Sequence, residues 1–163
     1  MHSTELYNTL LTLSRNPFFY NKIKLNDSFE SRIYLMFIHF SIMMIIFKKK
    51  EKKFSQKSYD SLFFNIENNL RELGYGDVAV NKKMKDLNKI LYDILLKIDN
   101  SENDSIKINK SLIIKYFNQL NDKDSQKYLD FERYLKDFYK FCFDLSLENM
   151  IREAINFKDY GST

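Results

Sequence analysis

A turn that contains two of the chain's three glycines, Gly74 and Gly76, constrains the fold more than any other stretch. Apolar residues before it recur at the three- and four-residue spacing of an amphipathic helix, at Tyr59, Leu62, Phe63, Ile66, Leu70 and Leu73. A second face of this kind follows it, at Met84, Leu87, Leu91, Ile94 and Ile98. The stretch is therefore predicted to be a tight turn between two helices.

The residue types in the turn specify it further. Gly74 lies where a helix commonly ends in a left-handed backbone conformation, which costs least in a residue without a Cβ atom. We expect a positive φ at Gly74 and, in the same turn, at Gly76. Asp77 is predicted to cap the second helix, because its carboxylate can accept hydrogen bonds from free N–H groups of the first turn.

Glycine and proline are scarce throughout, with three Gly and one Pro in 163 residues. A fold of many strands needs more turn residues than this, so helices are favoured. Hydrophobic residues make up 44% of the chain and charged residues 29%, which is enough apolar material for a packed core. We predict an all-α fold, a single compact domain of about seven helices over residues 1–163.

The most apolar run, residues 33–47, is predicted to be a central buried helix that starts near Asp27 and Glu30. A membrane span is the alternative, but it needs about 20 apolar residues, and this run is shorter and contains His39 and Ser41. A third interpretation is a helix that contacts lipid or an apolar partner directly. His39 is expected to be a hydrogen-bonded interior residue.

Other apolar faces complete the helices. The first, at Leu6, Leu10 and Leu13, is expected to begin at Ser3 and to stop before Pro17. The polar residues 100–105 are expected to form an exposed loop, and Ser146 to cap a last helix. Two further faces in the last third are formed by Leu112, Ile113, Tyr116, Phe117 and Leu120, and by Phe131, Tyr134, Leu135, Phe138, Phe141, Cys142 and Leu145.

Basic residues are concentrated in the first 98 positions, which carry 16 Lys and Arg against 10 Asp and Glu, whereas the whole chain has a net charge of +4. One cluster, residues 48–53, follows the apolar run, where cations also complement a helix C-terminus. A second, Lys82, Lys83, Lys85 and Lys89, lies early in a predicted helix, where cations oppose the macrodipole. Binding to anionic lipid or to ribosomal RNA phosphates is the functional interpretation of both.

Several short stretches resemble the ubiquinol–cytochrome c chaperone family. Residues 70–77 (Leu-Arg-Glu-Leu-Gly-Tyr-Gly-Asp) with residues 82–85 (Lys-Lys-Met-Lys) look like its signature, and residues 16–20 (Asn-Pro-Phe-Phe-Tyr) resemble its Pro-x-Phe-Tyr element. Residues 27–32 with His39, and the aromatic Tyr92, are similar to further positions. The best-matching part is residues 6–98. The chain departs from the family at Tyr75, at Ser31 and at residues 93–94.

The resemblance implies an assembly chaperone that binds newly made cytochrome b and promotes assembly of the bc1 complex (complex III). It implies a cytoplasmic bacterial-type protein, peripheral at the inner membrane, without a signal peptide or transmembrane span. A ribosome, an anionic membrane surface and a small helical partner subunit are further expected partners, and specific DNA is not. The alternative is a peripheral membrane or nucleic-acid binding module without a dedicated client.

Nothing in the residues indicates an enzyme. Gly74-x-Gly76-x-x-Ala79 matches a dinucleotide fingerprint, but that motif requires a preceding strand, and here a helix precedes it. His39 has only His2 as a companion, so no metal site or catalytic triad is predicted, and no cofactor. The lone Cys142 cannot form an internal disulfide, fits a reducing compartment and is expected to be a buried thiol.

Two sets of candidate binding residues follow. The predicted client-binding residues are Phe18, Phe19, Tyr20, Arg71, Tyr75, Asp77, Lys82, Lys83 and Lys85. The predicted anionic-surface residues are Lys48, Lys49, Lys50, Lys52 and Lys53. For the aromatic residues 18–20 a second interpretation stays open, a hydrophobic plug that holds the loop onto the core.

Overall fold

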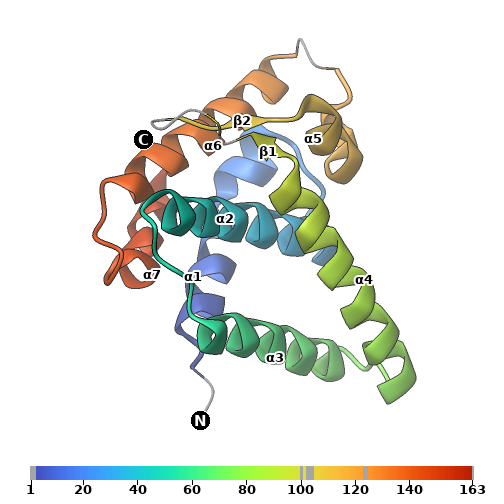
Figure 1. Ribbon diagram of the computed structural model, residues 1–163. Helices are drawn as coiled ribbons and strands as arrows, with labels where there is room; N and C mark the ends of the chain where they lie inside the picture. The colour runs from blue at the N-terminus through green and yellow to red at the C-terminus, as the bar shows by residue number, and fades with distance from the viewer. Residues whose placement is uncertain (1–2, 100, 102–104, 123–124, 163) are drawn as a thin grey trace.

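Helix α2 (Phe29–Lys49) is the axis of the fold, and the other helices surround it in the computed structural model of Figure 1. The structure describes residues 3–99, 101, 105–122 and 125–162. The all-α prediction and the expected number of helices are confirmed. The other elements are α1 (Glu5–Ser14), the π-helical turn η1 (Phe18–Lys22), α3 (Gln56–Glu72), α4 (Asp77–Leu96), β1 (Ile98–Asp99), β2 (Lys107–Ile108), α5 (Lys110–Tyr116), η2 (Asn118–Leu120), α6 (Gln126–Phe143), α7 (Met150–Glu153) and η3 (Ala154–Asp159).

The burial of α2 on all sides explains its composition. Helices α1, α4 and α6 pack against it, and between residues 33 and 47 only Tyr34 and Met44 are not fully buried. Its length and composition would allow it to cross a membrane, but 72% of its most apolar stretch is buried inside the protein. The prediction of a central core helix is confirmed. Its cap is Ser28, whose hydroxyl accepts from the Ser31 N–H (3.2 Å), and not Asp27, which lies 3.5 Å from the Arg32 guanidinium.

His39 occupies the interior of the bundle as predicted. Its Nδ1 lies 2.6 Å from the Leu35 carbonyl oxygen, which can only accept, so Nδ1 carries the proton. In the neutral ring Nε2 then accepts from the Tyr134 hydroxyl on α6, at 2.7 Å. Complete burial lowers the pKa of His39 to about 4, which keeps the ring neutral.

The last third of the chain packs back onto α1. The Thr9 hydroxyl donates to the Ile151 carbonyl (2.9 Å), and the Asn16 side-chain amide donates to the Tyr160 carbonyl (3.0 Å). The last helix begins at Met150, after Asn149, and not at a cap on Ser146 as predicted. The reason is that residues 144–149 form turns whose backbone N–H groups bond locally.

Gly161 was not singled out from the sequence, although its position is demanding. Its φ is +80°, and a Cβ atom there would lie 2.7 Å from Cδ1 of Phe18. Glycine is therefore required at this position both by the backbone conformation and by the aromatic ring beneath it.

The turn between α3 and α4 ends α3 with a complete Schellman motif. The Tyr75 N–H donates to the Leu70 carbonyl (3.2 Å) and the Gly74 N–H to the Arg71 carbonyl (3.0 Å), with Gly74 at φ +98° as predicted. The expectation for Gly76 was wrong, because its φ is −76° in an extended conformation. Gly76 is also the N-cap of α4, so Asp77 is the first helical residue and not the cap.

A short antiparallel ladder that the sequence did not predict joins α4 to α5. It pairs Ile98 with Ile108 and Asp99 with Lys107. The residues between its strands include the predicted loop, of which only Ser101 and Ser105 belong to the described part. Ser101 is exposed and Ser105 half-buried.

Candidate functional site

A cleft of about 220 Å³ lies between α1, the first half of α2 and the end of α3. Its walls are mostly apolar, and two arginines and one amide stand among them. The lining residues are Tyr7, Leu11, Arg15, Phe29, Arg32, Ile33, Met36, Asn69 and Leu73. Such a mixture suits an apolar segment that also carries hydrogen-bond acceptors or negative charge.

The two arginines of the cleft differ in how they are held. Arg32 is oriented by the Asp27 carboxylate and donates from Nε to the Ser28 carbonyl at 3.4 Å. Arg15 is exposed and forms no ion pair within the described part of the chain. Burial raises the pKa of Tyr7 beside them, and raises that of Tyr20 to about 12, so both phenols are neutral donors at physiological pH.

Two predicted client-binding residues, Arg71 and Asp77, bind each other across the α3–α4 turn. The Arg71 guanidinium pairs with the Asp77 carboxylate and also lies 3.5 Å from Glu67. Asp77 is the first residue of α4, and its carboxylate is turned back toward Arg71 of α3. Both residues thus have a structural partner that fastens the turn.

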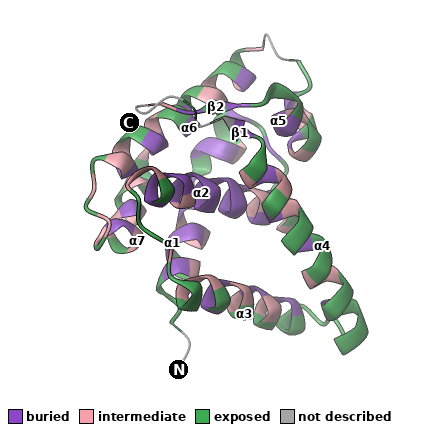
Figure 2. Ribbon diagram, in the orientation of Figure 1, coloured by how far each residue is buried: buried purple, intermediate pink, exposed green. Residues whose placement is uncertain are grey.

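The same turn exposes three large apolar side chains. Leu73 is 57% exposed, Tyr75 39% and Val78 84%. Tyr75 was predicted as a binding residue, whereas Leu73 and Val78 were missed, Leu73 because its helical spacing assigned it to the core. Figure 2 shows the exposed residues of this turn at the far end of α3 and α4. Leu73 also lines the cleft, so the apolar surface of the cleft continues onto the turn.

The predicted lysines of α4 lie next to this turn and are available to a partner. Lys82 and Lys85 are exposed and Lys83 is half-exposed, and none of the three forms an ion pair in the described residues. These lysines oppose the helix dipole less than their place in the sequence suggested. Because α4 begins at Asp77, Lys82 already lies in its second turn, where the dipole effect has largely faded.

The aromatic residues 18–20 do not form a cleft wall. Phe18 and Phe19 are buried against Tyr134, at centroid distances of 5.6 and 4.7 Å. Tyr20 is half-buried, and its hydroxyl donates to the Ser14 carbonyl at 2.7 Å. Prediction of Phe18 and Phe19 as binding residues was therefore wrong, and the hydrophobic plug is the correct interpretation.

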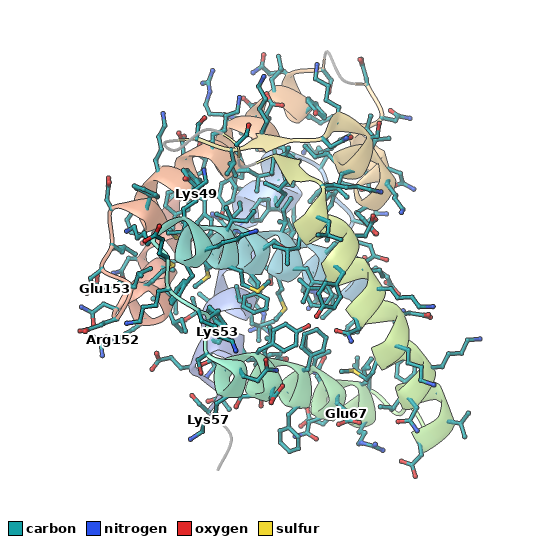
Figure 3. All side chains as sticks on the ribbon, viewed as in Figure 1. Lys49, Lys53, Lys57, Glu67, Arg152 and Glu153 are labelled. Atoms are coloured by element: carbon teal, nitrogen blue, oxygen red, sulfur yellow. The ribbon has the colours of Figure 1, made fainter. Side chains whose placement is uncertain are left out.

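The basic cluster that follows α2 is divided between the interior and the surface. Lys49 donates to the Tyr139 hydroxyl at 3.0 Å, and Lys50 to the Leu145 carbonyl at 3.2 Å, so neither is free for an anionic surface as predicted. Lys48, Lys52 and Lys53 are exposed, and Figure 3 shows Lys49 and Lys53 on different sides of the end of α2.

The two basic clusters do not form one face. Helix α3 lies between them in the chain and in space, with the lysines of residues 48–53 before its first turn and those of α4 after its last (Figure 1). A helix of its length spans roughly 25 Å, so a single small ligand would not contact both.

Asp93, at which the sequence departs from the family that it resembles, has a structural role. Asp93 on α4 accepts from Lys97 at 2.7 Å, from Lys115 at 2.9 Å and from the Tyr116 hydroxyl. These bonds lower the pKa of Asp93, with Lys97 making the largest contribution, and they tie α4 to α5.

The described residues form neither a metal-ligating cluster nor an activated thiol. Within residues 3–99, 101, 105–122 and 125–162, the structure gathers no group of three or more His, Cys, Asp or Glu that could hold a metal ion. Cys142 is buried as predicted, and burial raises the pKa of its thiol far above the physiological range.

Comparison with known proteins gives a clear family. The model of the ubiquinol–cytochrome C chaperone family matches residues 21–155, from η1 to η3. The match begins after the Pro-x-Phe-Tyr-like stretch and includes the last third of the chain, beyond the expected residues 6–98. Neither a curated protein nor a solved structure matches. The chain belongs to the ubiquinol–cytochrome c chaperone family.

Proposed function

We propose that this chaperone binds newly made cytochrome b in the cleft between α1, α2 and α3 and holds it for assembly into the bc1 complex. The observation that carries the proposal is the cleft itself, lined by apolar side chains and by Arg15, which forms no ion pair with any residue that the structure describes. A membrane protein before assembly presents apolar surface together with interfacial polar groups, and this combination matches the lining.

The mechanism that we propose is shielding without chemistry. The side chains of Leu11, Phe29 and Leu73 would cover apolar client surface that otherwise aggregates, and Arg15 would pair with a client carboxylate or carbonyl. Since Arg15 has no ion-pair partner among the described residues, binding would not first require an existing ion pair to be broken. We place this activity at the cytoplasmic face of the inner membrane, where cytochrome b is inserted.

The test is affinity capture of cytochrome b from detergent-solubilised cells in which it is co-expressed with the tagged chaperone. Two cleft variants, Arg15→Glu and Leu11→Ser, are compared with Arg133→Glu and Leu129→Ser, which change the same residue types on the exposed side of α6. We expect each cleft variant to lower capture about tenfold, the effect of a residue worth about 1.4 kcal/mol at an interface.

The α6 variants should capture cytochrome b like the wild type. Thermal melts of all four variants establish that each protein is folded before capture is compared. Equal capture by cleft and α6 variants would place the client elsewhere, and failure of the wild type to capture cytochrome b would refute the client itself.

A further inference from the structure

The turn between α3 and α4 projects from the body of the protein. Every residue from Arg71 to Ala79 is exposed, and a Cβ atom placed at Gly74 or Gly76 would have no heavy atom within 4 Å. Figure 1 shows the turn where α3 and α4 meet, away from both termini. The Schellman bonds and the Arg71–Asp77 pair hold it in one conformation, so its exposure is not that of a loose loop.

The apolar side chains on this projection are out of place in a surface turn. Leu73, Tyr75 and Val78 lie within six residues of one another, and Val78 is 84% exposed in the first turn of α4. Exposed apolar residues are ordinary when they are scattered, but three of them on one rigid convex turn indicate a partner. A projecting apolar tip is suited to inserting into a deformable surface.

Exposed lysines follow the tip along α4, on the same side of the helix as Val78. Val78, Lys82, Lys85 and Lys89 are all exposed and follow one another at spacings of four, three and four residues, on the side of α4 opposite Leu87 and Leu91.

One of the three acidic residues nearby is neutralised, because Asp77 forms an ion pair with Arg71. Glu72 and Asp86 are exposed. Residues 71–89 therefore carry five basic and three acidic side chains, which leaves a net positive charge behind the tip.

We propose that this turn is a membrane-docking tip. Tyr75 and Val78, with Leu73 beside them, enter the interfacial layer of an anionic bilayer, and Lys82 and Lys85 contact the lipid phosphates behind them. An apolar tip followed by cations matches the order of layers in a bilayer, where apolar chains lie beneath charged headgroups. An RNA surface would contact the lysines but would leave Leu73 and Val78 in water, so the lipid headgroup is the phosphate source that these side chains favour.

This docking would also orient the cleft. Because Leu73 belongs both to the tip and to the cleft lining, a docked tip holds one end of the cleft at the membrane surface. The inference does not depend on cytochrome b, since the bilayer alone supplies every contact that it requires.

The experiment is co-flotation of the full chain with vesicles that contain no protein. One set consists of equal parts of phosphatidylcholine and phosphatidylglycerol, and the other of phosphatidylcholine alone. We expect binding to the anionic vesicles that weakens with added salt. Val78→Ser should lower the partition coefficient about tenfold, the loss expected when an apolar side chain of this size is removed from the interface.

Matched variants separate the tip from the rest of the surface. Leu96→Ser changes a side chain that is 80% exposed at the other end of the same helix, and it should leave binding unchanged. Lys82→Gln together with Lys85→Gln should lower binding by about fivefold per lysine. Lys140→Gln together with Lys158→Gln, two exposed lysines outside both basic clusters, should have no effect.

Four results would overturn the inference. They are no binding of the wild type to anionic vesicles, unchanged binding of Val78→Ser, an equal loss in Leu96→Ser, and binding to a single-stranded RNA oligonucleotide that anionic vesicles do not displace. Capture of cytochrome b in detergent is measured without vesicles, so it can succeed or fail independently of this result.

Discussion

The hydroxyl of Tyr134 on α6 donates to Nε2 of His39 on α2 across 2.7 Å, and this bond joins two helices through a neutral imidazole. Protonation of His39 would put an N–H at Nε2, facing the Tyr134 hydroxyl that donates to this atom, and it would bury a positive charge. The pKa of His39 in the folded protein is accordingly lowered to about 4, below the value of about 6.5 that it takes in an unfolded chain.

The free energy of unfolding should therefore fall as the pH is lowered from about 6.5 toward 4. In this window the unfolded chain binds a proton at His39 that the folded protein does not, so acid favours unfolding, by up to about 1.4 kcal/mol per pH unit. Above this window the contribution is complete. Urea unfolding at several pH values measures the slope, and His39→Gln, which cannot titrate, should reduce it. An unchanged slope in the variant would show that other groups cause it.

Asp93 should change the free energy of unfolding at a lower pH than His39 does. Its pKa is lowered by Lys97, Tyr116 and Lys115, so its contribution to stability is complete above the unfolded value of about 3.9 and is lost as the pH falls below it. At pH 7 we expect Asp93→Asn to cost about 1–2 kcal/mol, a modest figure because both lysines are about half exposed. Asp60→Asn on the surface of α3 is the control and should change the free energy of unfolding by less than about 0.5 kcal/mol.

Local signals in the sequence predicted the helices well and their ends less well. A continuous apolar run identified α2, apolar periodicity identified α3 and α4, and Gly74 was correctly assigned a positive φ, because each of these depends on neighbours in the chain. Gly76 was expected to have a positive φ but is the N-cap of α4, and Asp77 was expected to be the cap but is the first helical residue. Glycine and aspartate are both favoured as N-caps, so the residue types alone do not decide between them, and in the structure the Asp77 carboxylate is turned back toward Arg71.

The candidate site was predicted only in part, because it depends on which surfaces the fold covers. Lys49 and Lys50 are neighbours of Lys48, but successive side chains on a helix point about 100° apart, so two of them turn toward α6 and the segment after it. The cleft joins Arg32 of α2 with Arg15 and Leu73, which directly follow α1 and α3, and no sequence spacing connects them. Tyr75 and the lysines of α4 were found because they lie in one continuous segment.

The two glycines of the α3–α4 turn provide a matched pair. Gly74→Ala should lower the free energy of unfolding by about 1 kcal/mol, because alanine is strained at φ +98° although no atom crowds it. Gly76→Ala should be neutral within about 0.5 kcal/mol or slightly stabilising, since φ −76° suits any residue. Chemical denaturation of both variants tests this, and a larger loss at Gly76 than at Gly74 would contradict the turn geometry.

Gly161 should tolerate alanine less well than Gly74. It combines a φ of +80° with a Cβ position 2.7 Å from the Phe18 ring, so Gly161→Ala should cost about 2–3 kcal/mol through strain and overpacking. A second change, Phe18→Leu, removes part of the ring and should make the alanine less costly than it is in the wild type. Additive losses in this double-mutant cycle would show that the two residues do not contact each other.

The burial of α2 has a consequence for how the protein is made. A ribosome releases this apolar helix when residue 49 emerges, but α6, which covers one of its sides, ends at Phe143. About 90 residues separate the two events, a delay on the order of 5 to 20 s at typical rates of synthesis. During that interval the chain displays a segment of the length and composition that membrane insertion machinery accepts. Complete burial of α2 therefore has to wait until α6 has been synthesised and has packed against it.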